Sequence, residues 1–161
     1  EYKKGSTFWF DINVEINKTI DIKETEPVNT KDLNGLKILV AEDNKINMMV
    51  LLTFLKKWNV QFTASVNGAQ ALEQYKKSEY DLVLMDLEMP EMDGYTAIKE
   101  IRKQGGFTPV IAFTAALYDG MAMDLKSKGF DDYLHKPFNP LDLFKKISKY
   151  AAVPAGVTKL S

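Results

Sequence analysis

The chain has 161 residues, of which 45% are hydrophobic and 27% charged, a composition typical of a globular protein with one α/β core. Its 21 Lys and Arg residues against 22 Asp and Glu residues give a net charge of -1, so we expect no nucleic-acid partner and no direct membrane contact through bulk charge. The lack of Cys excludes disulfides, thiolate metal sites and a cysteine nucleophile.

The first predicted element is a half-buried strand at residues 8–16. Every second residue from Phe8 is apolar, and the residues between them are mostly polar, which is the period of a strand with one buried face. A polar segment with a single proline follows, at residues 21–34. Because this segment has no periodicity, it is predicted to be a linker that separates the strand from the rest of the chain.

Strand and helix patterns then alternate five times up to Tyr150. The predicted strands are residues 36–41, 60–65, 82–86, 109–114 and 131–135. The predicted helices are residues 44–58, a segment capped by Asn67, and residues 95–103, 118–128 and 139–150. Such alternation implies right-handed βαβ crossovers, and therefore a parallel sheet with helices on both faces.

Asparagine marks the start of three of these helices. Asn44, Asn67 and Asn139 each precede a helical pattern, and an asparagine side chain can accept a hydrogen bond from a free N–H of the first turn. On the first helix we expect an inward apolar face, which comprises Ile46, Met49, Val50 and Phe54.

The central strand ends on a carboxylate. Residues 82–85 are uninterrupted apolar sequence, as in a strand buried on both faces, and Asp86 follows them. The other strand ends also carry polar groups, namely Glu42, Asp43, Thr114 and Lys136. Because the carboxyl ends of parallel strands lie at one edge of the sheet, we expect these groups to meet there.

Three clustered carboxylates repel one another unless a cation lies among them. Without Cys and with a single His, the hard oxygen ligands favour Mg²⁺. Lys136 and Thr114 would then complete a pocket for a phosphoryl group. Each residue also has an ordinary interpretation: Asp43 could cap a helix, Thr114 could be a strand-end hydroxyl and Lys136 a surface charge. Their joint occurrence at separate strand ends favours the site.

These motifs closely resemble the receiver domain of two-component response regulators. The resemblance lies in Glu42-Asp43, the block LVLMDLEMPEMDG around Asp86, Thr114-Ala115 and Lys136-Pro137-Phe138. It implies a receiver domain at residues 36–152 with a flavodoxin-like (βα)5 fold and the sheet order 2-1-3-4-5. It also implies that Asp86 accepts a phosphoryl group from a phosphohistidine and that the domain then changes conformation.

The resemblance further assigns the metal ligands and the switch. It implies that Mg²⁺ is held by Asp43, Asp86 and the backbone carbonyl of Glu88, and by Glu42 through water. It implies that the Lys136–Pro137 peptide is cis. The conformational switch would couple Thr114 to the aromatic residue Tyr133.

The N-terminal segment resembles the last strand of a histidine-kinase ATP-binding domain. This resemblance implies a kinase remnant at residues 1–22, a linker at 23–35 and, after the receiver, a tail at 153–161. That is the layout of a hybrid sensor histidine kinase, a transferase. We expect the fragment in the cytoplasm, with membrane anchoring of the parent chain left open. The fragment lacks nucleotide-binding motifs, so we expect a phosphoacceptor whose partner is a histidine-kinase dimerisation/phosphotransfer domain or a histidine phosphotransfer protein.

Two alternative functions stay open at this point. A Mg²⁺-dependent phosphohydrolase would use Asp86 as nucleophile and Glu88, two residues on, as general acid. Against it, the loop carries no segment that could cap a substrate. A degenerate receiver would only bind partners, and the intact set of acidic residues, Thr114 and Lys136 argues against that interpretation.

Overall fold

The computed structural model describes residues 33–151, which form one parallel sheet covered by helices. The sheet has the order β2-β1-β3-β4-β5, and every pair of neighbours is parallel. Its strands are β1 (Lys37–Ala41), β2 (Gln61–Ser65), β3 (Leu82–Asp86), β4 (Val110–Thr114) and β5 (Asp132–His135). The predicted flavodoxin-like fold and sheet order are therefore confirmed.

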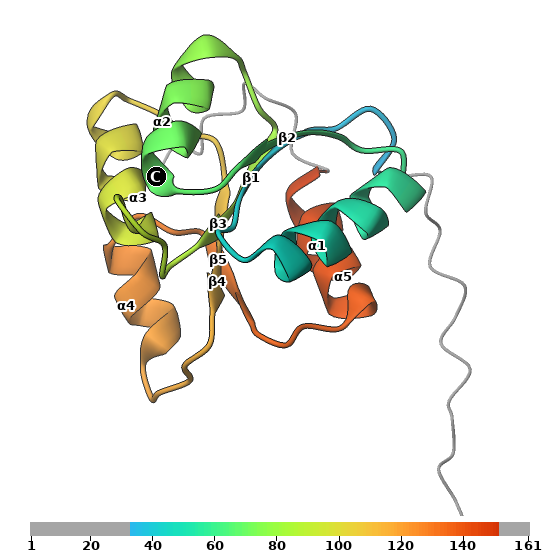
Figure 1. The fold of residues 1–161 in the computed structure, drawn as a ribbon. Coiled ribbons are helices and arrows are strands. Elements are labelled where there is room, and N and C mark those ends of the chain that lie inside the picture. Colours follow the sequence, from blue (N-terminus) through green and yellow to red (C-terminus); the bar gives the residue numbers. More distant parts are fainter. Residues whose placement is uncertain (1–32, 152–161) are drawn as a thin grey trace, which may run out of the picture.

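The helices cover the two faces of the sheet unequally. They are α1 (Lys45–Lys57), α2 (Gly68–Lys77), α3 (Gly94–Lys103), α4 (Met121–Ser127) and α5 (Pro140–Ala151). Figure 1 shows α1 and α5 on one face of the sheet and α2, α3 and α4 on the other. Each strand is thus followed by a helix that returns the chain to the amino edge of the sheet, so all carboxyl ends of the strands lie together.

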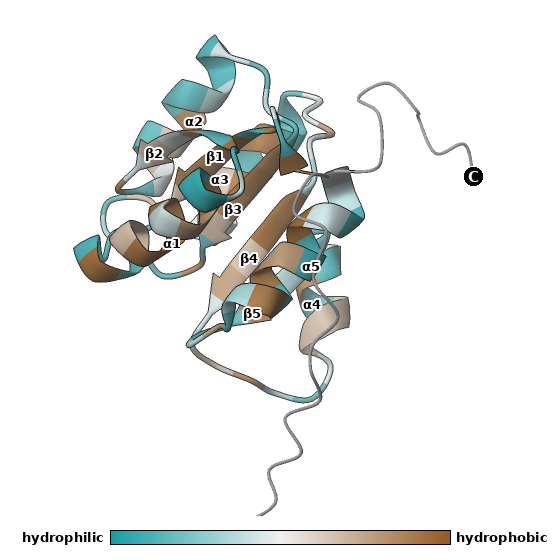
Figure 2. Ribbon diagram, turned by 90° about the vertical axis from the view of Figure 1, so that its right-hand side faces the viewer, coloured by the Kyte–Doolittle hydropathy of each residue, from teal (hydrophilic) through white to brown (hydrophobic). Residues whose placement is uncertain are grey.

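The apolar residues form two cores, one on each face of the sheet. The first core includes Ile38, Leu84 and Phe113 of the strands and packs against α1 and α5. The second includes Leu39, Met85 and Ala112 and packs against α2, α3 and α4. In Figure 2 the central strands are coloured mainly hydrophobic, whereas the helices on both sides alternate between hydrophilic and hydrophobic residues. Burial on both faces explains why β1, β3 and β4 are nearly continuous apolar sequence.

The predicted helix caps are confirmed. The side chain of Asn44 accepts hydrogen bonds from the N–H of Ile46 at 2.9 Å and of Asn47 at 3.2 Å. Asn67 accepts from Gln70 N, and Asn139 from Asp142 N, both at 2.8 Å. These bonds satisfy N–H groups that have no partner within the helix.

The predicted start of the fourth helix is wrong by three residues. The helix begins at Met121, whereas the pattern indicated residue 118. The residue before the helix, Gly120, has a φ of 84°. This left-handed conformation cannot belong to a right-handed helix, so the chain up to Gly120 is a loop.

The predicted inward face of α1 is confirmed at Phe54, which packs partly buried against the first core, but is wrong at the other three residues. Ile46, Met49 and Val50 are exposed, with 68%, 64% and 40% of their surface accessible. The fully buried residues of this helix are Leu51 and Leu55. The helix therefore turns a different apolar stripe toward the sheet, and it leaves an apolar surface open next to the carboxyl edge.

The folded unit includes a residue that the sequence placed in the linker. Leu33 is fully buried in the core under α1 and α5, and the N–H of Gly35 donates to the carbonyl of Asn59 at 3.2 Å. The predicted kinase remnant at residues 1–22 and the tail at 153–161 lie outside the described residues.

Candidate functional site

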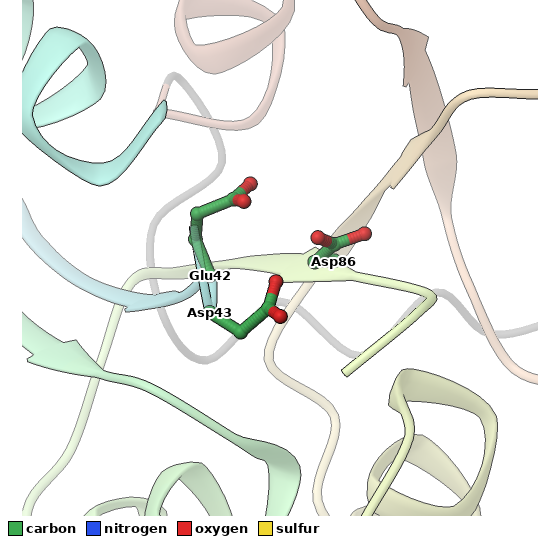
Figure 3. Close-up of side chains that lie close together, drawn as sticks. All are labelled: Glu42, Asp43 and Asp86. Atoms are coloured by element: carbon green, nitrogen blue, oxygen red, sulfur yellow. The ribbon is translucent and has the colours of Figure 1, made fainter. Parts of the chain in front are cut away.

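Three carboxylates converge at the carboxyl edge of the sheet. Glu42 and Asp43 follow β1, and Asp86 is the last residue of β3. One oxygen from each carboxylate lies within 4.8 Å of the others, and Figure 3 shows the three side chains around a common space. The predicted acidic cluster is therefore present in the structure.

Asp86 is buried at the end of the central strand. The residue is 5% exposed, and its Oδ1 accepts a hydrogen bond from the N–H of Glu88 at 3.2 Å. The start of α3 passes close behind it: a Cβ at Gly94 would lie 2.2 Å from the backbone oxygen of Asp86. Only glycine permits this approach, and so the DG pair that ends the motif fixes the strand end against the next helix.

Lys136 connects two of the carboxylates. Its Nζ lies 2.6 Å from Asp86 Oδ2 and 2.7 Å from Glu42 Oε2. Burial by itself lowers the pKa of Lys136, but the hydrogen bonds to Asp86 and Glu42 outweigh burial and hold its pKa above the ordinary value. The lysine therefore stays a cation at neutral pH. The Lys136–Pro137 peptide is cis, as predicted.

Glu42 is held by a residue that the sequence did not indicate. Its side chain is fully buried, and Oε1 accepts hydrogen bonds from Asn47 Nδ2 at 3.0 Å and from the N–H of Asn44 at 3.3 Å. Asn47 lies one turn into α1, so only the fold brings it back over β1. A polar residue within the otherwise apolar run 46–52 was the available signal.

The donor set fits a small, hard divalent cation. The cluster offers carboxylate oxygens, one acid exposed to solvent and two buried, and Mg²⁺ is bound in proteins through a few carboxylates and retained waters. Asp43 is free for such a role because Asn44, not Asp43, caps α1. Glu88 itself is exposed and meets Asp86 through its backbone N–H. It does not present a general acid to Asp86 in these contacts.

Thr114 and Tyr133 lie beside the cluster but are not joined to it in this conformation. The hydroxyl of Thr114, which is buried, donates to the carbonyl of Ala116 at 3.0 Å and accepts from its N–H at 3.1 Å. Tyr133 is paired with Ala112 in the sheet and packs partly buried against the second core. Thr114 follows Ala112 by two positions on β4, so the side chains of Thr114 and Ala112 belong to the same face of the sheet. Tyr133, the partner of Ala112 on β5, belongs to that face as well.

The whole arrangement matches a known family. The family model for the response regulator receiver domain matches residues 38–148. The chain belongs to the receiver domain family. It is thus a module of two-component phosphorelay signalling, and the resemblance inferred from the motifs is confirmed.

Curated relatives of this receiver domain are much longer proteins. Hybrid signal transduction histidine kinase G of Dictyostelium discoideum is 38% identical over 123 residues, which are 73% of this chain and 4% of that protein. The autoinducer 2 sensor kinase/phosphatase LuxQ of Vibrio vulnificus is 35% identical over 159 residues, 94% of this chain and 18% of that protein. The chain therefore spans less than a fifth of the length of these two kinases.

Solved receiver domains have the same fold. The receiver domain of a sensor histidine kinase from Pseudomonas aeruginosa, crystallised with a magnesium ion in its active site cleft, superposes with a TM-score of 0.68 at 34% identity, over 74% of this chain and 99% of that one. The receiver domain of Ssk1 from Saccharomyces cerevisiae, solved in complex with the histidine phosphotransfer protein Ypd1, gives 0.68 at 32% identity, over 74% and 90%.

Among residues 33–151, none of the helices has the length and hydropathy that crossing a membrane would require.

Proposed function

We propose that this receiver domain accepts a phosphoryl group on Asp86 from a phosphohistidine of a histidine-kinase dimerisation/phosphotransfer domain or a histidine phosphotransfer protein. The observation that carries the proposal is the position of Lys136, whose Nζ lies 2.6 Å from the carboxylate of Asp86 at the mouth of an acidic cluster. A buried strand end that presents one nucleophilic oxygen and one fixed cation is suited to phosphoryl transfer.

In the proposed reaction a carboxylate oxygen of Asp86 attacks the phosphorus atom. The P–N bond of the phosphohistidine breaks, its electron pair returns to the imidazole, and an acyl phosphate forms on Asp86. The N–H of Glu88 holds Oδ1 and Lys136 contacts Oδ2. Lys136 is thereby placed to pair with a phosphoryl oxygen once the bond to Asp86 has formed.

The proposed metal ligands are Asp43 and Asp86, with the backbone carbonyl of Glu88, and Glu42 acts through water. The chemistry that Mg²⁺ supplies when bound is neutralisation of charge on the transferring phosphoryl group. Asn47 contributes by fixing the orientation of Glu42 through a hydrogen bond of 3.0 Å. The same ion would relieve the repulsion among the three carboxylates.

The conformational response is assigned to Thr114 and Tyr133. The Thr114 hydroxyl would leave its present bonds to Ala116 and turn to the phosphoryl oxygens. Its movement opens space beside Ala112, which the ring of Tyr133 can then occupy. One modification thus biases a two-state element and changes the surface formed by α4, β5 and α5.

The exposed apolar surface of α1 is the proposed docking site for the histidine-bearing partner. Ile46, Met49 and Val50 lie on the helix that starts two residues after Asp43, so a partner seated there is beside Asp86. The yeast receiver–Ypd1 complex supports a histidine phosphotransfer protein as the kind of partner. The similarity to a hybrid signal transduction histidine kinase supports a parent chain that is itself a histidine kinase, and we propose that this receiver domain works in the cytoplasm.

Two donors test the proposal. Phosphoramidate, a small donor with a P–N bond, should modify the protein once per chain in the presence of Mg²⁺, and Asp86→Asn should abolish the modification. Continuous release of phosphate from a phosphomonoester, with no stable adduct, would instead favour the phosphohydrolase alternative.

The α1 surface is tested with a matched pair of variants. Met49→Ala should slow transfer from phosphorylated Ypd1, leave transfer from phosphoramidate unchanged, and change the unfolding free energy by less than about 0.5 kcal/mol because the side chain is exposed. Leu51→Ala, on the buried face, should cost about 2–5 kcal/mol of stability. If Met49→Ala slowed transfer from phosphoramidate as much as transfer from phosphorylated Ypd1, the docking role of α1 would be contradicted.

A further inference from the structure

The first residue of β5 is the centre of a charge network that no part of the proposed reaction uses. The side chain of Asp132 is only 10% exposed and forms ion pairs with Lys146 and Lys149 of α5, the latter at 2.9 Å. Tyr150 Oη lies 3.3 Å from the same carboxylate. Burial by itself raises the pKa of Asp132, but the two lysines and the N–H of Tyr133 outweigh burial and hold its pKa below the ordinary value.

Lys146 also contacts the ring of Tyr133. Its Nζ lies 5.3 Å from the ring centroid, within the range of a cation–π interaction. Asp132 fixes both partners, because its Oδ1 pairs with Lys146 and accepts the N–H of Tyr133 at 2.9 Å. The lysine head group is therefore not a freely moving surface charge.

The direction of this contact follows from the sheet order. β5 is an edge strand. α5 packs on the face of the first core, whereas Tyr133 packs on the face of the second. Lys146 thus extends past β5, the outermost strand, and contacts the ring of Tyr133 from the side away from β4. β4, which carries Thr114 and the residue paired with Tyr133, Ala112, lies on the inner side of β5.

We propose that Lys146 is a positioning residue that holds the Tyr133 ring in the position seen in this structure, here called outward, and so sets how readily phosphorylation of Asp86 switches the domain. The inference rests on the proposed function of Asp86, Thr114 and Tyr133. When the ring turns inward it moves away from Lys146 and loses the cation–π interaction. The lysine therefore stabilises the unphosphorylated conformation.

The size of the effect follows from the contact. A cation–π interaction at a partly exposed site is worth a factor of about 2 to 5 in an equilibrium. If the outward conformation dominates before modification, the apparent affinity for an anion that requires the inward conformation changes by the same factor. Weakening the contact should therefore strengthen binding of beryllofluoride, which mimics the phosphoryl group on an aspartate.

The test is a beryllofluoride titration with Mg²⁺, followed by the amide signals around Thr114 and Tyr133. Lys146→Met, which keeps the aliphatic stem, should lower the half-saturating concentration about 2- to 5-fold. Lys146→Arg should restore the value of the unsubstituted protein. Lys145→Met removes the same charge from an exposed position of α5 and should not tighten binding. Loss of positive charge alone acts in the opposite direction, because it weakens binding of an anion.

The same substitution in a protein without the Tyr133 ring separates positioning of the ring from a general effect of Lys146 on anion binding. In Tyr133→Leu protein, Lys146→Met should no longer change the half-saturating concentration. An equal change with and without the tyrosine ring, or no tightening in Lys146→Met, would overturn the role of Lys146 while the site at Asp86 stands. If the unsubstituted protein and Lys146→Met both fail to respond, the proposed function falls, and the inference falls with it.

Discussion

The two edges of the sheet use charge in opposite ways. At the carboxyl edge three carboxylates, Glu42, Asp43 and Asp86, lie together with one lysine, Lys136, which pairs with Glu42 and Asp86. At the amino edge every acid of the last strand region has its own cation: Asp131 pairs with Arg102 at 2.8 Å, and Asp132 pairs with two lysines of α5. The first cluster carries excess negative charge, and the second is neutralised.

The amino edge also satisfies its backbone groups. Arg102 donates to the carbonyl of Gly129 at 2.8 and 3.0 Å, to Gly106 at 2.8 Å and to Thr108 at 2.9 Å. One side chain thereby closes two loops that precede β4 and β5. A fully paired network of this kind stabilises the fold, whereas an unbalanced one leaves interactions to be gained from a ligand. We infer that the amino edge serves stability and the carboxyl edge serves function.

Among the charged residues of the two edges, the largest effect is expected at Arg102. Arg102→Met should lower the free energy of unfolding by about 2–4 kcal/mol, because three carbonyls and the carboxylate of Asp131 lose their partner. Phosphorylation of the protein that remains folded should persist. Urea unfolding and phosphoramidate labelling measure the two properties separately.

Arg102→Lys is the control for this variant. Lysine keeps the charge opposite Asp131 but lacks the planar guanidinium group that reaches several carbonyls. The stability of Arg102→Lys should therefore lie between that of the unsubstituted protein and that of Arg102→Met. A loss of labelling as large as the loss of stability would show that the two edges are not separate.

The next effect is at Asp132 and depends on pH. Because the folded state lowers the pKa of Asp132 below the unfolded value of about 3.9, the carboxylate contributes stability that is present above that value and is lost as the pH falls through the folded pKa. Asp132→Asn should cost about 1–2 kcal/mol at pH 7, and the difference from the unsubstituted protein should shrink below pH of about 4. Thermal unfolding at several pH values checks this; a difference that is constant down to pH of about 2 would contradict the role of the charged form.

The smallest effect is at Asp43 and has the opposite sign. Asp43→Asn removes one of three like charges and should raise stability without Mg²⁺ by a few tenths to about 1 kcal/mol, since the residue is exposed and screened. It should also remove the Mg²⁺-induced shifts of the amides of residues 42, 86 and 88. Unchanged shifts in this variant would exclude Asp43 as a ligand.

The positions of β1, β3 and β4 and their terminal residues could be predicted from the sequence because burial on both faces leaves a continuous apolar pattern. Asp86 and Thr114 each end such a run, and the parallel order then brings the ends together. The motif resemblance added the roles of these residues, which the alternation of strands and helices alone does not contain.

The errors have a physical cause in each case. α1 has apolar residues around most of its circumference, so periodicity did not decide between the stripe of Met49 and that of Leu51. The start of α4 depends on the left-handed backbone of Gly120, which the sequence allows but does not require. Asn47 bonds to Glu42, 5 residues earlier in the chain, and Lys146 contacts the ring of Tyr133, 13 residues earlier. Only tertiary structure brings each of these pairs together.

The central claim is that Asp86 is the phosphoacceptor, and peptide mass spectrometry tests it most directly. The protein is incubated with phosphoramidate and Mg²⁺, quenched and digested, and a second sample is treated with hydroxylamine, which cleaves acyl phosphates. We expect one phosphoryl group on the peptide that contains Asp86, its removal by hydroxylamine and its absence from Asp86→Asn. The same phosphoryl group on Asp86→Asn, or a hydroxylamine-resistant adduct at another residue, would contradict the account.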